Sequence, residues 1–170
     1  MKAILLIDHG SRREEANEML ACMAALVQRL AGEAVVVRYA HMELAEPTIA
    51  QGFEACVAAG ATEVVAFPYM LSPGRHSTSD IPGFVAEAAR AHPNIAFRVT
   101  PAFGVDPGLA DVILMRAGIQ PAGALTDSDG CRCWHPDGEP GACGDACPAR
   151  SAPQWSSLGS DVARKGSGIR

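Results

Sequence analysis

The sequence has no apolar run long enough to cross a membrane, no long run of basic residues and no internal repeat. A membrane-spanning helix needs roughly 20 consecutive apolar residues. The first apolar run, residues 3–7, is also too short for the core of a signal peptide. The formal net charge of −5 argues against nucleic acid as a partner. These absences predict a cytoplasmic protein that binds neither a membrane nor nucleic acid.

Cysteine is present, but its placement is uneven. In a cytoplasmic protein the six cysteines are expected to be thiols or metal ligands rather than disulfides. Cys22 and Cys56 lie in apolar, helix-like patterns, which indicates ordinary core positions. The other four lie in the last third of the chain: Cys131, Cys133, Cys143 and Cys147.

Two patterns alternate through residue 119. Short apolar segments favour strands at residues 2–8, 34–44, 62–70 and 94–100. Segments with helical spacing follow each of them, and their ends show turn or cap signals. These signals are a capping box from Ser11 to Glu14, Pro47 in a first turn, Ser79 or Asp80 as a cap, and Asp106-Pro107. Such alternation predicts an α/β fold with a four-stranded parallel sheet and helices on both faces.

After residue 119 the periodic patterns end. Of the 51 residues from 120 to 170, 19 are Gly, Pro or Ser, which predicts an irregular tail outside an α/β domain of residues 1–119. The plain interpretation is that the four tail cysteines are incidental. The alternative is a zinc or iron–sulfur site, since four cysteines are the usual ligand set for either. The C-x-C and C-x3-C spacings match neither common zinc pairs nor a ferredoxin run.

Three predicted strand ends carry side chains that can coordinate a metal. His9 follows the first strand, Glu43 ends the second, and His76 follows the third. Ligands of parallel sheets bind beyond the carboxyl ends of the strands, so these three side chains are expected to converge. Two imidazoles and a carboxylate suit a divalent transition metal, and the imidazoles could equally accept protons.

Each of these residues also has a plainer interpretation. Either histidine alone could be a solvated loop residue, and Ser11 could serve only as a helix cap. Glu43 could place a charge at the start of the next helix. His41 could line the same pocket, although a structural role within the strand is slightly favoured.

The segments "HGSR", "HMELAEPTI" and "FPYMLSPGRHSTSDIP", at this spacing, resemble the short sirohydrochlorin chelatases, the CbiX-type class II chelatases. The resemblance covers residues 1–119. It implies insertion of Co²⁺ or Fe²⁺ into sirohydrochlorin, on the way to cobalamin or sirohaem. It also implies that His9 and His76 are catalytic metal-site residues, with Glu43 as the acidic pocket residue.

The resemblance has two further implications. Related class II chelatases have two such halves in one chain or pair two short chains, so a single half implies a homodimer. The substrate is rich in carboxylates, and an acidic protein must gather positive charge beside it. The candidate substrate-binding residues adjoin the two histidines in sequence: Ser11, Arg12, Arg13 and Arg75. Arg12 and Arg13 could instead form a solvated first helical turn.

Two other functions remain open at this point. One is a non-catalytic metal-binding or metal-delivery protein that uses the same histidines and the tail cysteines. The other is an inactive relative that only binds a tetrapyrrole, which the presence of both histidines argues against. The sequence does not distinguish cobalt, iron and nickel, because the same donor set suits all three.

Overall fold

The structure of the protein is a computed structural model that describes residues 1–123. The chain divides into two units, Met1–Gly104 and Val105–Arg170, which are described separately. No helix in residues 1–123 is long and apolar enough to span a membrane.

The first unit is built on a four-stranded sheet with the order β2-β1-β3-β4. All three neighbouring pairs are parallel. This confirms the predicted α/β fold and parallel sheet. The strands are β1 (Lys2–Asp8), β2 (Val35–His41), β3 (Glu63–Pro68) and β4 (Ala96–Val99).

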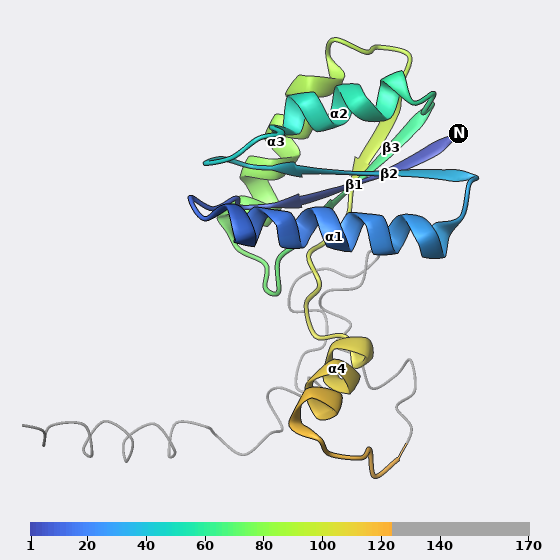
Figure 1. The fold of residues 1–170 in the computed structure, drawn as a ribbon. Helices are drawn as coiled ribbons and strands as arrows, with labels where there is room; N and C mark the ends of the chain where they lie inside the picture. The colour runs from blue at the N-terminus through green and yellow to red at the C-terminus, as the bar shows by residue number, and fades with distance from the viewer. Residues whose placement is uncertain (124–170) are drawn as a thin grey trace, which may run out of the picture. The chain divides into compact units, whose positions relative to one another are not determined.

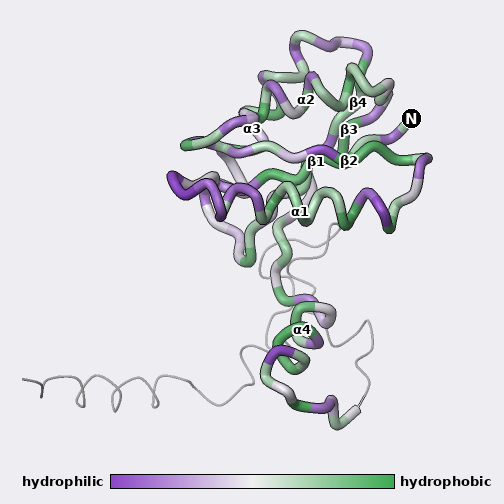
Figure 2. Tube along the Cα trace, in the orientation of Figure 1, coloured by the Kyte–Doolittle hydropathy of each residue, from purple (hydrophilic) through white to green (hydrophobic). Residues whose placement is uncertain are grey.

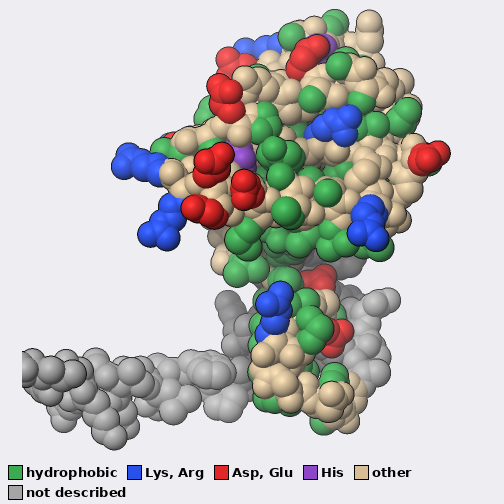
Figure 3. Space-filling model, in the orientation of Figure 1, with side chains coloured by type: hydrophobic (Ala, Val, Ile, Leu, Met, Phe, Trp, Pro, Cys, Tyr) green, Lys and Arg blue, Asp and Glu red, His purple; other side chains and the backbone are tan. Residues whose placement is uncertain are grey.

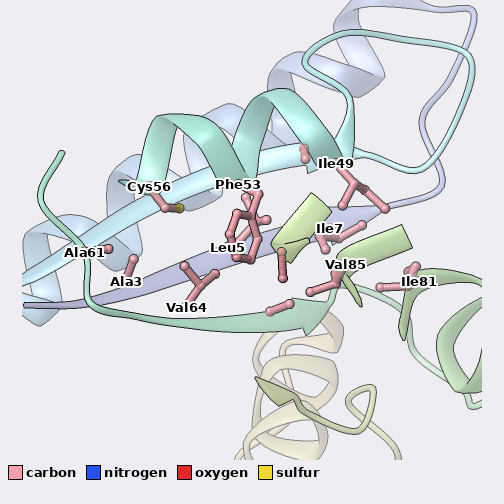
Figure 4. Packing of buried hydrophobic residues seen from close by; sticks show 13 residues of the cluster. Ala3, Leu5, Ile7, Ile49, Phe53, Cys56, Ala61, Val64, Ile81 and Val85 are labelled. Atoms are coloured by element: carbon pink, nitrogen blue, oxygen red, sulfur yellow. The ribbon is translucent and has the colours of Figure 1, made fainter. Parts of the chain in front are cut away.

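Helices cover both faces of this sheet (Figure 1). α1 (Glu14–Ala31) lies on one face, and α2 (Ile49–Ala58) and α3 (Ile81–Ala89) lie on the other. The larger core lies under α2 and α3. Its buried members come from β1, β2, β3, α2 and α3, and Figure 4 shows Leu5, Ile7, Phe53, Val64 and Val85 packed together.

The core under α1 is smaller. It is centred on Leu6, Leu20, Ala24 and Val37. Only one stripe of α1 reaches it, and Figure 2 shows the helix alternating between hydrophilic and hydrophobic residues. Alternate β1 residues therefore enter different cores, which explains why this strand reads as a continuous apolar run.

Several predicted element ends are wrong. The Ser11–Glu14 capping box does not form, because α1 begins at Glu14 after Arg13 and has no side-chain cap. The second strand ends at His41 rather than at residue 44. α2 starts after Thr48, which forms a capping box with Gln51, so Pro47 lies outside the helix.

The predicted cap of α3 at Ser79 or Asp80 is also wrong. A single turn of π-helix, η1 (His76–Asp80), runs directly into α3, and no side chain caps it. Backbone already helical before α3 supplies the first turn, so no cap is needed.

The second unit contains α4 (Pro107–Ala117) within its described part. The Asp106 side chain accepts a hydrogen bond from the Gly108 backbone N–H, and Gly118 ends the helix in the left-handed conformation. This confirms the start of the last helix predicted at Asp106-Pro107.

Candidate functional site

The turn after β1 carries His9 and is closed by Gly10. Gly10 has a φ of +83°, and a Cβ placed there would lie 1.9 Å from the Glu43 carbonyl oxygen. Only glycine therefore fits. Because the turn has no side chain at this point, the backbone after β2 approaches it closely.

The backbone after β2 continues to pair with the turn after β1. The Met42 N–H donates to the Asp8 carbonyl at 2.8 Å, and the Glu43 N–H donates to the His9 carbonyl at 3.1 Å. The parallel pairing of β1 with β2 thus extends past the assigned strands. Glu43 is placed beside His9 by main-chain hydrogen bonds rather than by its own side chain.

The His9 and Glu43 side chains meet at the carboxyl edge of the sheet. His9 Nε2 lies 2.8 Å from Glu43 Oε1, and the two side chains are 43% and 53% exposed. Since both are half exposed, an incoming cation or substrate can reach them. The other ring nitrogen, His9 Nδ1, faces the Gly10 carbonyl oxygen at 3.2 Å.

His76 reaches the same place from the loop after β3. Its ring packs edge-on against the His9 ring, with centroids 5.2 Å apart and an interplanar angle of 72°. His76 Nδ1 lies 3.0 Å from Asp80 Oδ2, one helical turn later. The structure therefore places His9 beside Glu43 and against the His76 ring at this edge.

Both histidines are oriented as metal ligands usually are. A coordinating imidazole commonly donates its second ring N–H to a carboxylate or a backbone carbonyl. Here Asp80 occupies Nδ1 of His76, and the Gly10 carbonyl faces Nδ1 of His9. Nε2 of each ring is therefore available to coordinate a ligand. Nε2 of His9 points toward the Glu43 carboxylate.

The donors are close but do not form a closed cage. Two donors on one transition metal stand about 3 Å apart when each bond is about 2.1 Å long, which matches the 2.8 Å between His9 and Glu43. Among residues 1–123, no three His, Cys, Asp or Glu side chains are gathered into a ready-made metal group.

The predicted substrate-binding residues lie around this edge. Arg75 is 86% exposed, and its Nε lies 3.6 Å from Asp80 Oδ1. Arg12 and Arg13 are exposed in the turn before α1. Side chains of both charge signs gather at this end of α1 (Figure 3). The cations can therefore meet an anionic substrate although the whole chain is acidic.

Ser11 has a different environment from the one predicted. Its backbone N–H and carbonyl both bond to the Asn17 side chain, and its hydroxyl accepts from the Arg13 N–H at 3.1 Å. The hydroxyl thus bonds within the turn before α1 rather than capping the helix.

Sequence reasoning missed Asp80 as a partner of the site. The signal was its spacing of four residues from His76, which places both on one side of a helical turn. His41, whose role was left open, is buried and does not line the accessible edge. The cysteines of the proposed tail site, Cys131, Cys133, Cys143 and Cys147, lie outside the described residues.

Comparison with known proteins adds to this geometry. The family model named CbiX matches residues 3–119. The chain belongs to the CbiX family. The chain is 43% identical over 110 residues to a chloroplastic sirohydrochlorin ferrochelatase of Arabidopsis thaliana, covering 65% of this chain and 48% of that one. A sirohydrochlorin cobaltochelatase of Priestia megaterium is 31% identical over 116 residues, covering 68% and 37%.

A solved structure agrees with the fold of this CbiX-family chain. The sirohydrochlorin chelatase SirB from Bacillus subtilis subspecies spizizenii, in complex with cobalt, superposes with a TM-score of 0.63 at 34% identity. The match covers 69% of this chain and 50% of that chain. The chain therefore spans about half the length of the curated relatives that it matches.

Proposed function

We propose that this chain inserts Co²⁺ or Fe²⁺ into sirohydrochlorin, as a sirohydrochlorin chelatase. The observation that carries the proposal is that the His9 imidazole meets both the Glu43 carboxylate and the His76 ring at an exposed sheet edge in a CbiX-family chain. Relatives named for iron and for cobalt insertion both match it. The product would enter sirohaem or cobalamin synthesis accordingly.

The site residues have two tasks in this reaction. Nε2 of His9 and of His76, with the Glu43 carboxylate, would hold the divalent metal at the edge of the sheet. The metal replaces two pyrrole N–H protons, so those two protons must be accepted. Once the metal has passed to the ring, His9 Nε2 and the Glu43 carboxylate no longer bind it and would accept the two protons. Both side chains are half exposed, so solvent can carry the protons away.

Positive charge near the site would bind the carboxylates of the tetrapyrrole. Arg75 is largely exposed beside His76, and Arg12 and Arg13 are exposed beside His9. Guanidinium groups pair with carboxylates through two parallel hydrogen bonds, which gives both affinity and orientation. Asp80 offsets part of the Arg75 charge, and it contacts both Arg75 and His76.

Three further predictions accompany this function. A homodimer, in which a second copy supplies the other half of the cleft, stays a prediction from the family resemblance. Residues 1–119 are proposed as the catalytic domain, with residues 120–170 as a tail outside it. The sequence-based expectation of a cytoplasmic protein also stays a prediction.

The deciding experiment follows the visible spectrum of sirohydrochlorin under anaerobic conditions. Co²⁺, Fe²⁺ and Ni²⁺ are each added with and without the protein. We expect insertion of cobalt or iron to be much faster with protein than with the metal alone. Unchanged rates for every metal would contradict the proposal. Tight Co²⁺ binding with unchanged rates would identify a metal-delivery protein.

A further inference from the structure

A second histidine–carboxylate pair lies directly behind the site. His41 and Asp8 are register partners at the ends of β2 and β1. His41 Nδ1 lies 2.6 Å from Asp8 Oδ1, and the His41 side chain is only 1% exposed. A carboxylate can only accept, so the imidazole donates through Nδ1.

This pair is costly for a core. Within residues 1–123, His41 Nε2 is the buried side-chain nitrogen or oxygen that has no hydrogen-bond partner. Leaving a buried polar atom unpaired is unfavourable. Apolar residues of similar volume often replace a buried pair without loss of stability. Packing alone therefore does not account for an imidazole and a carboxylate at this position.

The Asp8 carboxylate also holds the turn that carries His9. The same Oδ1 atom accepts from the Gly10 backbone N–H at 2.9 Å. One oxygen thus joins the buried imidazole to the backbone turn. Gly10 in turn packs against the Glu43 carbonyl and the His41 Cβ. Both exposed members of the site, His9 and Glu43, are in contact with this arrangement through their backbones.

From this geometry we infer that Asp8 and His41 are positioning residues for the site, a role that rests on the proposed function. His41 fixes the Asp8 carboxylate, and Asp8 fixes the Gly10 turn. The fixed turn directs the His9 ring toward His76 and Glu43. In this role neither residue binds the metal itself: His41 is enclosed, and the Asp8 oxygen that faces it also holds the Gly10 N–H.

The inference is tested with matched variants in the full-length chain. Asp8→Ala removes the acceptor, and His41→Phe keeps a planar ring but removes the Nδ1 donor. Asp8→Asn is the conservative variant, because its Oδ1 can still accept from Gly10. Val37→Ala is the control, since Val37 lies on the same face of β2 and is also buried.

The first readout needs no ligand and no activity. At 5.2 Å between centroids, the His9 and His76 rings give nuclear Overhauser effects between their ring protons. We expect these effects to be lost in Asp8→Ala and His41→Phe and kept in Val37→Ala. Folding is checked by circular dichroism, and if Asp8→Ala does not fold, His41→Phe and Asp8→Asn decide. Folded His41→Phe with unchanged effects would overturn the inference.

The second readout joins the positioning role to the chemistry. Mutating a residue that orients a metal ligand typically lowers metal affinity or activity by about 10–100-fold. We expect Asp8→Ala and His41→Phe to weaken Co²⁺ binding and to lower kcat for insertion by at least about tenfold. KM for sirohydrochlorin should stay within about twofold, because the arginines are untouched, and Asp8→Asn should recover most of kcat. Equal kinetics in Val37→Ala and His41→Phe would contradict the inference. If the wild type inserts no metal, the proposed function fails, but the nuclear Overhauser effects between the His9 and His76 rings still test the positioning role.

Discussion

The two edges of the sheet carry charged residues of different kinds. At the amino edge, Lys2 pairs with Glu63 at 3.4 Å, and Arg98 approaches the same carboxylate at 3.8 Å. These are exposed pairs between permanent charges of opposite sign. At the carboxyl edge, imidazoles face carboxylates, as in His9 with Glu43 at 2.8 Å. A lysine ammonium has no lone pair to offer, whereas a neutral imidazole does. The carboxyl edge therefore offers two imidazoles beside carboxylates, a donor set that suits a transition metal.

The glycine turns at the two edges differ in how closely other backbone packs against them. Gly60 and Gly10 both have a positive φ, at +90° and +83°. A Cβ on Gly60 would meet nothing within 4 Å, but one on Gly10 would lie 1.9 Å from the Glu43 carbonyl. Gly60 serves only backbone conformation, while Gly10 also serves the close approach of two loops. The close packing belongs to the edge that carries the site.

The largest effect is expected from removing an imidazole at the carboxyl edge. His76→Ala and His9→Ala should each lower the rate of metal insertion by at least about 100-fold. The fold should be kept, because both residues are exposed loop or edge residues. Lys2→Ala at the amino edge is the matched control, with a rate unchanged and a free energy of unfolding within about 0.5 kcal/mol. Equal activity in all three variants would remove the distinction between the edges.

Substituting the two turn glycines comes next. Gly10→Ala should lower the free energy of unfolding by more than about 3 kcal/mol, because the clash with Glu43 adds to the strain of a positive φ. Gly60→Ala carries only the conformational cost of about 1–2 kcal/mol. Urea denaturation measures both. Similar losses would mean that the two loops do not pack as closely as the structure has them.

A smaller effect concerns the core near the amino edge. Burial raises the pKa of the Cys56 thiol from 9.0 to about 11, and the charge of Arg38 offsets part of this. The folded state therefore holds its proton to higher pH than the unfolded state does. Stability from this group is complete below pH 9 and is lost as the pH rises toward 11, with about 1 kcal/mol gone by pH 10.

Cys56→Ala isolates this contribution, since all other titrating groups are unchanged. Urea denaturation at pH 8 and pH 10 should show a steeper loss of stability in the wild type than in the variant. The rate of metal insertion at pH 7 should remain that of the wild type. A parallel pH dependence in both proteins would show that the thiol titrates normally.

The smallest effect is expected from removing residues 120–170. A chain that ends after Ile119 should fold, dimerise and insert metal from free ions at the wild-type rate. Light scattering and the spectral assay check this. A truncated dimer without activity would instead make the tail, with its four cysteines, part of the mechanism.

The sequence by itself determined the alternation of elements and the edge at which the site lies. Apolar β1, the helical spacing after it and the position of His9 past the strand are local or periodic features. Parallel connection then forces the ends of β1, β2 and β3 to one edge. His9, Glu43 and His76 could be named for that reason.

Only the tertiary structure decided how these side chains are held. The predicted cap of α1 was wrong. The Asn17 side chain hydrogen-bonds the backbone N–H and carbonyl of Ser11, and spacing alone does not indicate this partner. Asp8 and His41 are 33 residues apart in sequence and meet through strand register. Register arises from packing of whole strands, so no short motif records it. The residues proposed to bind the metal follow from where strands end, whereas those proposed to orient them follow from which strands are neighbours.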